Sequence, residues 1–382
     1  MNACKLWATV LLGVLWLPNV AASADAAKEA YQRGMSCLVK QDYDAAITAF
    51  TESIRLNPRF AKAYCNRGFA YGNKGDYDKA IADSDEAIRL APNDATAYYS
   101  RGVTYRKKGE FDKAIADYDE ALRLNPKYGE AYYSRGVAYK SKGDQDKAIT
   151  NYDAAIRYKP GFAEPYCGRG VAYGTKGDQD KAIADYNEAI RLNPKLAEAY
   201  YGRGVAYRHK DDYDQAIANY SEAIRYKSRF AEAYCGRGIA YECKGEYDKA
   251  IADSDEAIRL NPKLVEAYCG RGFACWHKRE YHEAITDYNE AIRLNRNCAD
   301  AYWGRGNCYR TKGENAKAEE DFEQARKLGY KAKPGWKMPG GVPVGPWSLI
   351  LIPVAVIGLI VYCVQRTLRG RPNVEANETE YL

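Results

Sequence analysis

The sequence of 382 residues carries 57 basic and 51 acidic residues, which gives a formal net charge of +6. The two signs alternate along the chain instead of forming blocks, as is typical of a solvated helical surface. So small and dispersed a charge argues against nucleic-acid binding, which favours a concentrated basic face. Tyrosine is unusually frequent, with 35 copies, and its place within a repeated pattern decides whether it fills a core or forms a contact surface.

Residues 1–24 are predicted to form a secretory signal peptide. One early cation, Lys5, precedes an apolar run over residues 6–17, and small residues occupy positions 21–24. This order is typical of an export signal with cleavage after Ala24, or alternatively after Ala22. A membrane anchor is the competing interpretation, but a run of twelve residues would span only ~18 Å as a helix, against a hydrocarbon core of ~30 Å.

An Arg-Gly pair returns every 34 residues, from Arg33-Gly34 to Arg305-Gly306, without insertion or deletion. A strict period of this length is typical of a solenoid, in which each repeat buries its apolar face against the next. We therefore expect one continuous helical stack instead of separate globular domains. With the glycine of the pair set as position 8, the nine repeats are 27–60, 61–94, 95–128, 129–162, 163–196, 197–230, 231–264, 265–298 and 299–332.

Each repeat is predicted to contain two helices, which we term helix A and helix B. In the third repeat, apolar residues recur at helical spacing over residues 95–107, and Gly109 supplies the left-handed residue that ends helix A. Glu110 then begins helix B with a carboxylate near its positive end. Helix B ends at Asn125, because Pro126 disfavours helix in the residue before it.

The pattern resembles the tetratricopeptide repeat family over residues 27–332. The residues that carry the resemblance in the sixth repeat are Tyr200, Gly204, Tyr207, Ala216 and Ala223, at positions 4, 8, 11, 20 and 27. The resemblance implies an all-α, right-handed superhelical solenoid of nine helix–turn–helix repeats, with a concave surface that binds a protein or peptide. Gly204 and Ala216 are the small residues that would let helices A and B approach closely.

The sixth, eighth and ninth repeats carry informative departures from this pattern. The sixth has Asp211 for the loop glycine and Ser228 for the terminal proline, and the eighth has Arg279 and Arg296 at the same two positions. We expect the connections between helices at these positions to be less rigid. The ninth repeat has charged residues on helix B, so we expect it to form a polar terminal cap.

Arginine at position 7 occurs in all nine repeats, and position 23 carries Asp or Asn in eight of them, including Asp83, Asp117, Asn151, Asp185 and Asp253. One interpretation is a column of anion-binding sites. The interpretation we favour is an internal set of pairs, in which the arginine stems pack between helices and the guanidinium groups bind those carboxylates.

The sequence predicts neither an enzyme nor a cofactor or metal site. No nucleophile–base motif, phosphate loop or paired carboxylates stand out, and the repeats leave no room for a catalytic domain. His209 and His277 share position 13, two repeats apart. Since neighbouring helices lie ~8–10 Å apart, these two histidines cannot share a zinc ion with bonds of ~2 Å.

Nine cysteines lie in the part of the chain predicted to be exported. Those at position 5 are expected to be free thiols or to fill the place that tyrosine takes in other repeats, because equal positions on neighbouring repeats exceed the usual Cα separation of a disulfide, ~7 Å. Cys275 and Cys308, at positions 11 and 10 of adjacent repeats, form the best candidate bridge. The four cysteines at position 5 are Cys65, Cys167, Cys235 and Cys269.

The chain after the repeats is predicted to anchor the protein to a membrane. Residues 333–346 are a Gly/Pro-rich linker, residues 347–364 an uncharged span of ~27 Å as a helix, and residues 365–382 a polar tail. A buried core helix and a cleaved lipid-anchor signal are the alternatives. Arginines follow the span, so we expect the repeats on the exported side, periplasmic or extracellular, and the tail in the cytoplasm.

The candidate binding surface is the stripe of helix A positions 2, 5, 9 and 12, which by family resemblance lines the concave side. Glycines at position 6 are expected to leave its floor clear, and acidic residues at position 2 to form a rim. The alternative is that these residues pack neighbouring A helices together. The predicted contact residues are Tyr99, Val103, Tyr133, Val137, Val171, Tyr201, Val205, Ile239, Phe273 and Trp303, with Glu164, Glu198 and Glu232 on the rim.

Two functions remain after these considerations. The first is a membrane-anchored, non-enzymatic scaffold that captures a protein or peptide segment with apolar anchors and a basic stretch. The second is a structural component that self-associates into a membrane-bound assembly.

Overall fold

The computed structural model describes residues 23–330. The predicted linker, membrane span and polar tail lie outside the described residues, as does all of the predicted signal peptide except residues 23 and 24. Within the described range, no helix is both long and apolar enough to cross a membrane.

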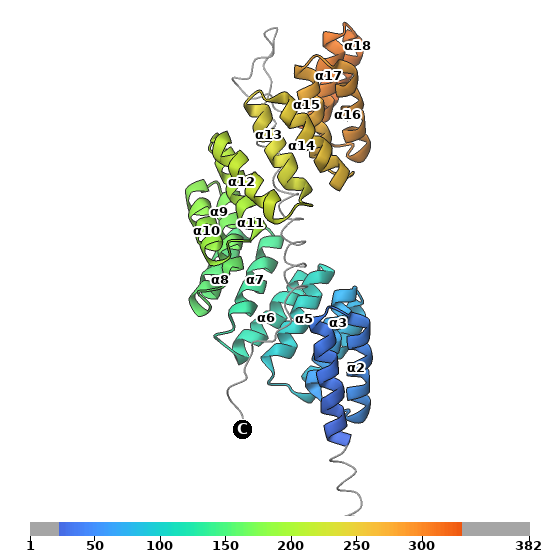
Figure 1. Ribbon diagram of the computed structural model, residues 1–382, viewed down its shortest axis with the longest axis vertical. Coiled ribbons are helices and arrows are strands. Elements are labelled where there is room, and N and C mark those ends of the chain that lie inside the picture. The colour runs from blue at the N-terminus through green and yellow to red at the C-terminus, as the bar shows by residue number, and fades with distance from the viewer. Residues whose placement is uncertain (1–22, 331–382) are drawn as a thin grey trace, which may run out of the picture. The chain divides into compact units, whose positions relative to one another are not determined.

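The described residues are all-α and contain eighteen helices, two for each of the nine predicted repeats. They fall into two compact units that divide between Pro160 and Gly161. The first unit holds four repeats, and within it each helix packs on the next one along the chain (Figure 1). Its helices are residues 23–39, α2 (Tyr43–Leu56), α3 (Ala61–Lys74), α4 (Tyr77–Leu90), α5 (Ala95–Lys108), α6 (Phe111–Leu124), α7 (Gly129–Ser141) and α8 (Gln145–Tyr158).

The second unit holds five repeats of the same design. Its odd-numbered helices are A helices and its even-numbered helices are B helices. They are α9 (Ala163–Thr175), α10 (Gln179–Leu192), α11 (Ala197–His209), α12 (Tyr213–Tyr226), α13 (Ala231–Cys243), α14 (Tyr247–Leu260), α15 (Val265–His277), α16 (Tyr281–Leu294), α17 (Ala299–Thr311) and α18 (Asn315–Lys327).

Helices A and B of one repeat approach closely at position 8. In the sixth repeat, a Cβ added at Gly204 would lie 2.9 Å from Cε1 of Tyr220 and 3.3 Å from the backbone oxygen of Ala216. Both residues belong to helix B and are fully buried. The prediction that Gly204 and Ala216 permit this approach is therefore confirmed.

A left-handed residue at position 15 separates helix A from helix B throughout the described repeats. Six of these residues are glycines, with φ between 76° and 92°. Asp211 and Arg279 take the same conformation with φ of 59° and 67°, and so does Gln41, with φ of 59°. The three connections without glycine keep the left-handed conformation of the others, but a side chain in this region carries a steric cost that glycine avoids.

Arginine at position 7 pairs with position 23 of its own repeat, as predicted. Arg237 donates from Nε and Nη2 to the two carboxylate oxygens of Asp253, at 2.8 and 2.7 Å. Equivalent two-point pairs join Arg67, Arg101, Arg169, Arg271 and Arg305 to aspartates. The Arg237 guanidinium also lies over the ring of Tyr234 at position 4, 5.5 Å from its centroid. The hydrogen bonds between positions 7 and 23 confirm the favoured interpretation, in which the arginines are paired internally.

The same arginine has a second partner that the sequence analysis did not identify. Nη1 of Arg237 donates to Ser221 Oγ at 3.0 Å, on helix B of the preceding repeat. Position 25 supplies an oxygen acceptor of this kind repeatedly, as Thr51, Asp85, Asp119, Asn187, Asp255 and Asn289. Each of these arginines therefore ties one A helix to two successive B helices.

The last described repeat ends in a polar face, as expected for a cap. On α18, the side chains of Glu319 and Arg326 are 71% and 60% exposed. Phe322 on the opposite face is buried, and its ring lies 4.7 Å from that of Trp303 on α17.

We expect Arg279→Gly to raise the free energy of unfolding by about 1 kcal/mol, because glycine adopts a positive φ without the steric cost of a side chain. The greater freedom of glycine in the unfolded chain offsets part of this gain. Gly245→Arg, the reciprocal change in the preceding repeat, is the matched control and should lose stability. Denaturant unfolding followed by circular dichroism measures both, and equal stability of all three proteins would contradict the interpretation.

We expect Asp253→Ala to lower the free energy of unfolding by about 2–3 kcal/mol, because it leaves the Arg237 guanidinium half-buried without its main acceptor. Asp253→Asn should cost far less. Asparagine already occupies this position as Asn151 and Asn219, which accept from Arg135 and Arg203 at 2.7 and 2.6 Å. Thermal unfolding that gave the same midpoint for the Ala and Asn variants would show that the pairing is not stabilising.

Candidate binding surface

The structure places the predicted contact residues on successive A helices, but none of them is fully exposed. Five are buried: Tyr99, Val103, Tyr133, Val137 and Phe273. The other eight are half-buried: Val171, Tyr201, Val205, Ile239, Trp303, Glu164, Glu198 and Glu232.

Position 5 points into the joint between one repeat and the next. The ring of Tyr201 lies 5.1 Å from that of Phe230, at position 34, and 5.7 Å from that of Tyr220, on helix B. Tyr99 makes the corresponding contacts with Tyr128 and Tyr118, at 5.0 and 5.9 Å. At this position the contacts therefore support the alternative interpretation, in which the side chains pack helices together.

The prediction that position 6 glycines leave the floor of the groove clear is wrong at Gly202, Gly236, Gly270 and Gly304. A Cβ added at Gly202 would lie 2.5 Å from the ring of Tyr186, which belongs to helix B of the preceding repeat. Gly304 meets the ring of Tyr288 in the same way. The absent side chains at Gly202 and Gly304 make room for a buried tyrosine, and not for a partner's backbone.

Position 9 supplies aliphatic residues that remain partly accessible. Val171, Val205 and Ile239 occupy consecutive repeats of the second unit and are half-buried. Each packs one edge against a buried cluster: Val205, for example, lies against the cluster of Ala216, Tyr220 and Ala240. Phe273 in the next repeat is only 3% exposed, so the accessible column covers α9, α11 and α13.

The acidic residues at position 2 do not form a uniform rim. Glu198 pairs with Lys227 at 3.0 Å, and Glu130 pairs with Lys159. Both lysines occupy position 31 of the same repeat, where most repeats have asparagine. Near α13 and α15, by contrast, burial and then the charge of Glu232 raise the pKa of Glu266. Of the residues described, none is a cation paired with Glu232 or Glu266, so negative charge is concentrated there.

Position 12 contributes charged side chains that the sequence analysis did not single out. Arg208 is 7% and Glu242 is 5% exposed. Burial raises the pKa of Glu242 well above its usual range, and the charge of Arg208 opposes this in part. In the same repeat as Glu242, Ser254 occupies position 24, where most repeats have tyrosine. The Glu242 carboxylate occupies the space beside Gly270, where an added Cβ would lie 2.7 Å from Oε1.

His277 packs among aromatic side chains. The His277 ring stacks on Tyr247 at 4.5 Å between centroids and contacts Phe273 at 4.6 Å. Burial lowers the pKa of His277 to about 4, so the ring is neutral at pH 7. Across residues 23–330, no group of three His, Cys, Asp or Glu side chains is placed to hold a metal ion.

Family models match most of the repeats. A model described as TPR repeat matches residues 36–75, 102–143, 138–177, 175–210 and 206–242. Models described as tetratricopeptide repeat match residues 61–94, 231–264, 276–335 and 85–116. A search of curated proteins finds no significant match to the sequence.

Solved structures share the fold at low sequence identity. The APC/C hetero-tetramer Cut9–Hcn1 matches with a TM-score of 0.59 and 18% identity, over 76% of this chain and 55% of that one. A tetratricopeptide repeat protein from Parabacteroides merdae matches with a TM-score of 0.51 and 20% identity, over 70% of this chain and 98% of that one. The chain thus spans about half the length of the first protein, and both matches concern the fold alone. With the family models on its repeats and the family's small residues at the helix contacts, the chain belongs to the tetratricopeptide repeat family.

Proposed function

We propose that the protein is a non-enzymatic scaffold that binds a protein or peptide segment on the A helices of its second unit. Tetratricopeptide repeat proteins are generally scaffolds of this kind. The observation that most supports the proposal is the column of Val171, Val205 and Ile239, half-buried on three consecutive repeats. Apolar groups repeated on one face of a solenoid are suited to the apolar anchors of a partner.

The partner that suits this surface carries apolar anchors and a basic stretch. Glu232 and Glu266 supply negative charge next to the column, and the raised pKa of Glu266 reflects an environment that a cation would relieve. Near Glu198 the charge is already neutralised by Lys227. We therefore place the basic stretch of the partner opposite α13 and α15, beyond the apolar anchors.

We expect the double substitution Val171→Asp and Val205→Asp to weaken partner capture at least tenfold, because a carboxylate at either position opposes burial of an apolar anchor. Quantitative affinity purification with the full-length protein measures the bound partner. Circular dichroism establishes whether the helices and the thermal midpoint are retained.

The matched control places the same two charges on B helices of the same repeats. Ala184 and Ala218 are exposed on α10 and α12, so Ala184→Asp with Ala218→Asp should leave capture unchanged. Val171→Thr with Val205→Thr keeps the side-chain shape should the Asp pair fail to fold. Unchanged capture by a folded Val171/Val205 variant would show that this column is not the site. If the species captured through it is a second copy of the chain, the self-association alternative is supported instead.

We also propose that the scaffold is exported and held to a membrane by residues 347–364. The support is the sequence alone: the signal-like residues 1–24, the uncharged span, and the arginines that follow it. Protease added to intact cells or spheroplasts should digest the repeats and spare a tag at the C-terminus. Repeats that resist protease until the membrane is dissolved would contradict this topology.

A further inference from the structure

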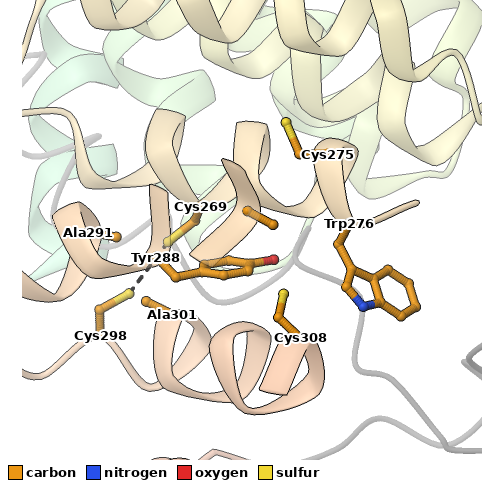
Figure 2. Close-up of a cluster of buried hydrophobic side chains, with 9 residues drawn as sticks. Cys269, Cys275, Trp276, Tyr288, Ala291, Cys298, Ala301 and Cys308 are labelled. Atoms are coloured by element: carbon orange, nitrogen blue, oxygen red, sulfur yellow. Dashed lines mark hydrogen bonds between the residues drawn. The ribbon is translucent and has the colours of Figure 1, made fainter. Parts of the chain in front are cut away.

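Two cysteines of the eighth repeat lie in contact in the interior of the second unit. The Sγ atoms of Cys269, on α15, and Cys298, before α17, are 3.7 Å apart (Figure 2). They are 1% and 6% exposed, and they share a buried cluster with Tyr288. The candidate bridge between Cys275 and Cys308 has no such contact in the part of the chain that the structure describes, and Figure 2 shows Cys275 pointing away from Cys308.

The contact between the two thiols follows from the geometry of the repeat, which places the side chains at positions 5 and 34 next to each other. Large side chains at positions 5 and 34 of one repeat meet in the first and sixth repeats: Tyr31 lies 4.9 Å from Phe60, and Tyr201 lies 5.1 Å from Phe230. In the seventh repeat, Cys235 and Leu264 occupy the two positions within one cluster. Only the eighth repeat has cysteine at both positions.

We propose that Cys269 and Cys298 form a disulfide that staples α15 to the joint before α17. A disulfide requires the sulfurs to approach to about 2.05 Å. Cys298 lies in the four-residue connection between α16 and α17, so small rotations of two side chains and a shift of this connection bring the sulfurs together. The joint is also one of the two that lack the usual proline, because Arg296 occupies that position.

The chemistry requires a disulfide oxidant, such as an oxidised low-molecular-weight thiol or a dithiol oxidoreductase. The Cys298 thiolate attacks one sulfur of that disulfide, which forms a mixed disulfide and releases one thiolate. Cys269 gives up its proton to a base, and its thiolate then attacks Cys298 Sγ and displaces the second thiolate. Two protein thiols are oxidised, and the oxidant is reduced to two thiols.

Cys298 is the better first nucleophile of the two. It is the N-cap residue of α17, and a helix N-terminus stabilises a thiolate. With Cys269 as donor, their hydrogen bond also lowers the pKa of the Cys298 thiol and raises that of Cys269. Because both sulfurs are buried, the oxidant reaches them when the joint opens or while the chain folds.

Mass mapping of the full chain in mild detergent tests the proposal. One sample is oxidised in the native state in a buffer of oxidised and reduced glutathione, and a second is refolded from denaturant in the same buffer. Free thiols are then blocked with N-ethylmaleimide. Trypsin places the four cysteines on separate peptides: 264–271 with Cys269, 272–278 with Cys275, 297–305 with Cys298 and 306–310 with Cys308.

We expect the main linked product to join peptides 264–271 and 297–305, in at least tenfold excess over any other pair. We also expect the oxidised protein to melt about 5 °C higher than the reduced protein, because the bond closes a long loop in the unfolded chain. Cys298→Ser should abolish that difference. Cys235→Ser, which removes a position 5 thiol without a cysteine partner, should leave it unchanged.

The mapping uses the unmodified sequence, so it decides the matter even if a variant fails to fold. Recovery of Cys269 and Cys298 as maleimide adducts in both samples would overturn the proposal, and so would a main product that joins Cys275 to Cys308. The outcome does not depend on partner capture or on the compartment of the repeats, so it is separate from any failure of the proposed function.

Discussion

The structure depends on the arginine at position 7, which in seven of the described repeats joins its own A helix to two successive B helices. One guanidinium binds the acceptor at position 23 of its own repeat, the acceptor at position 25 of the preceding repeat, and the face of a tyrosine at position 4. For Arg237 these are Asp253, Ser221 and Tyr234. A helix pair cannot bury its apolar side alone, so a polar link that repeats with the same period fixes the orientation of each new pair against the last.

The same interior explains where a binding surface is possible. Tyrosines at position 24 fill the space beside position 6 glycines of the next repeat, and position 5 side chains pack against position 34. The side chains at these positions therefore pack the helices of the solenoid against one another. The column of Val171, Val205 and Ile239 remains partly accessible in the second unit, next to a concentration of negative charge at Glu232 and Glu266.

Much of the fold could be predicted from the sequence, because the signals are local and repeat at a fixed spacing. The spacing of the Arg-Gly pairs gave the repeats, and the residues at positions 8 and 20 gave the contact between helices A and B. The pairing of Arg237 with Asp253 was also accessible, since both positions recur together. The left-handed conformation of Arg279 shows that the geometry of a joint persists even where its glycine is lost.

The surface was harder to predict, because it depends on contacts between different positions of neighbouring helices. A helical wheel places Gly202 beside the groove, but it does not show that Tyr186 of the preceding repeat fills that space. Comparing equal positions likewise misses Cys269 and Cys298, which meet across positions 5 and 34. The signal was present in the aromatic residues that occupy those two positions elsewhere, such as Tyr201 and Phe230.

We propose that partners dock on the A helices of the second unit. The most direct test of this proposal is photocrosslinking in cells, with a photoreactive residue at Val205 or, as the matched site on helix B of the same repeat, at Ala218. We expect a covalent adduct with a protein from position 205 that is at least tenfold more abundant than from position 218. Equal adducts from both positions, or adducts from position 218 alone, would contradict it.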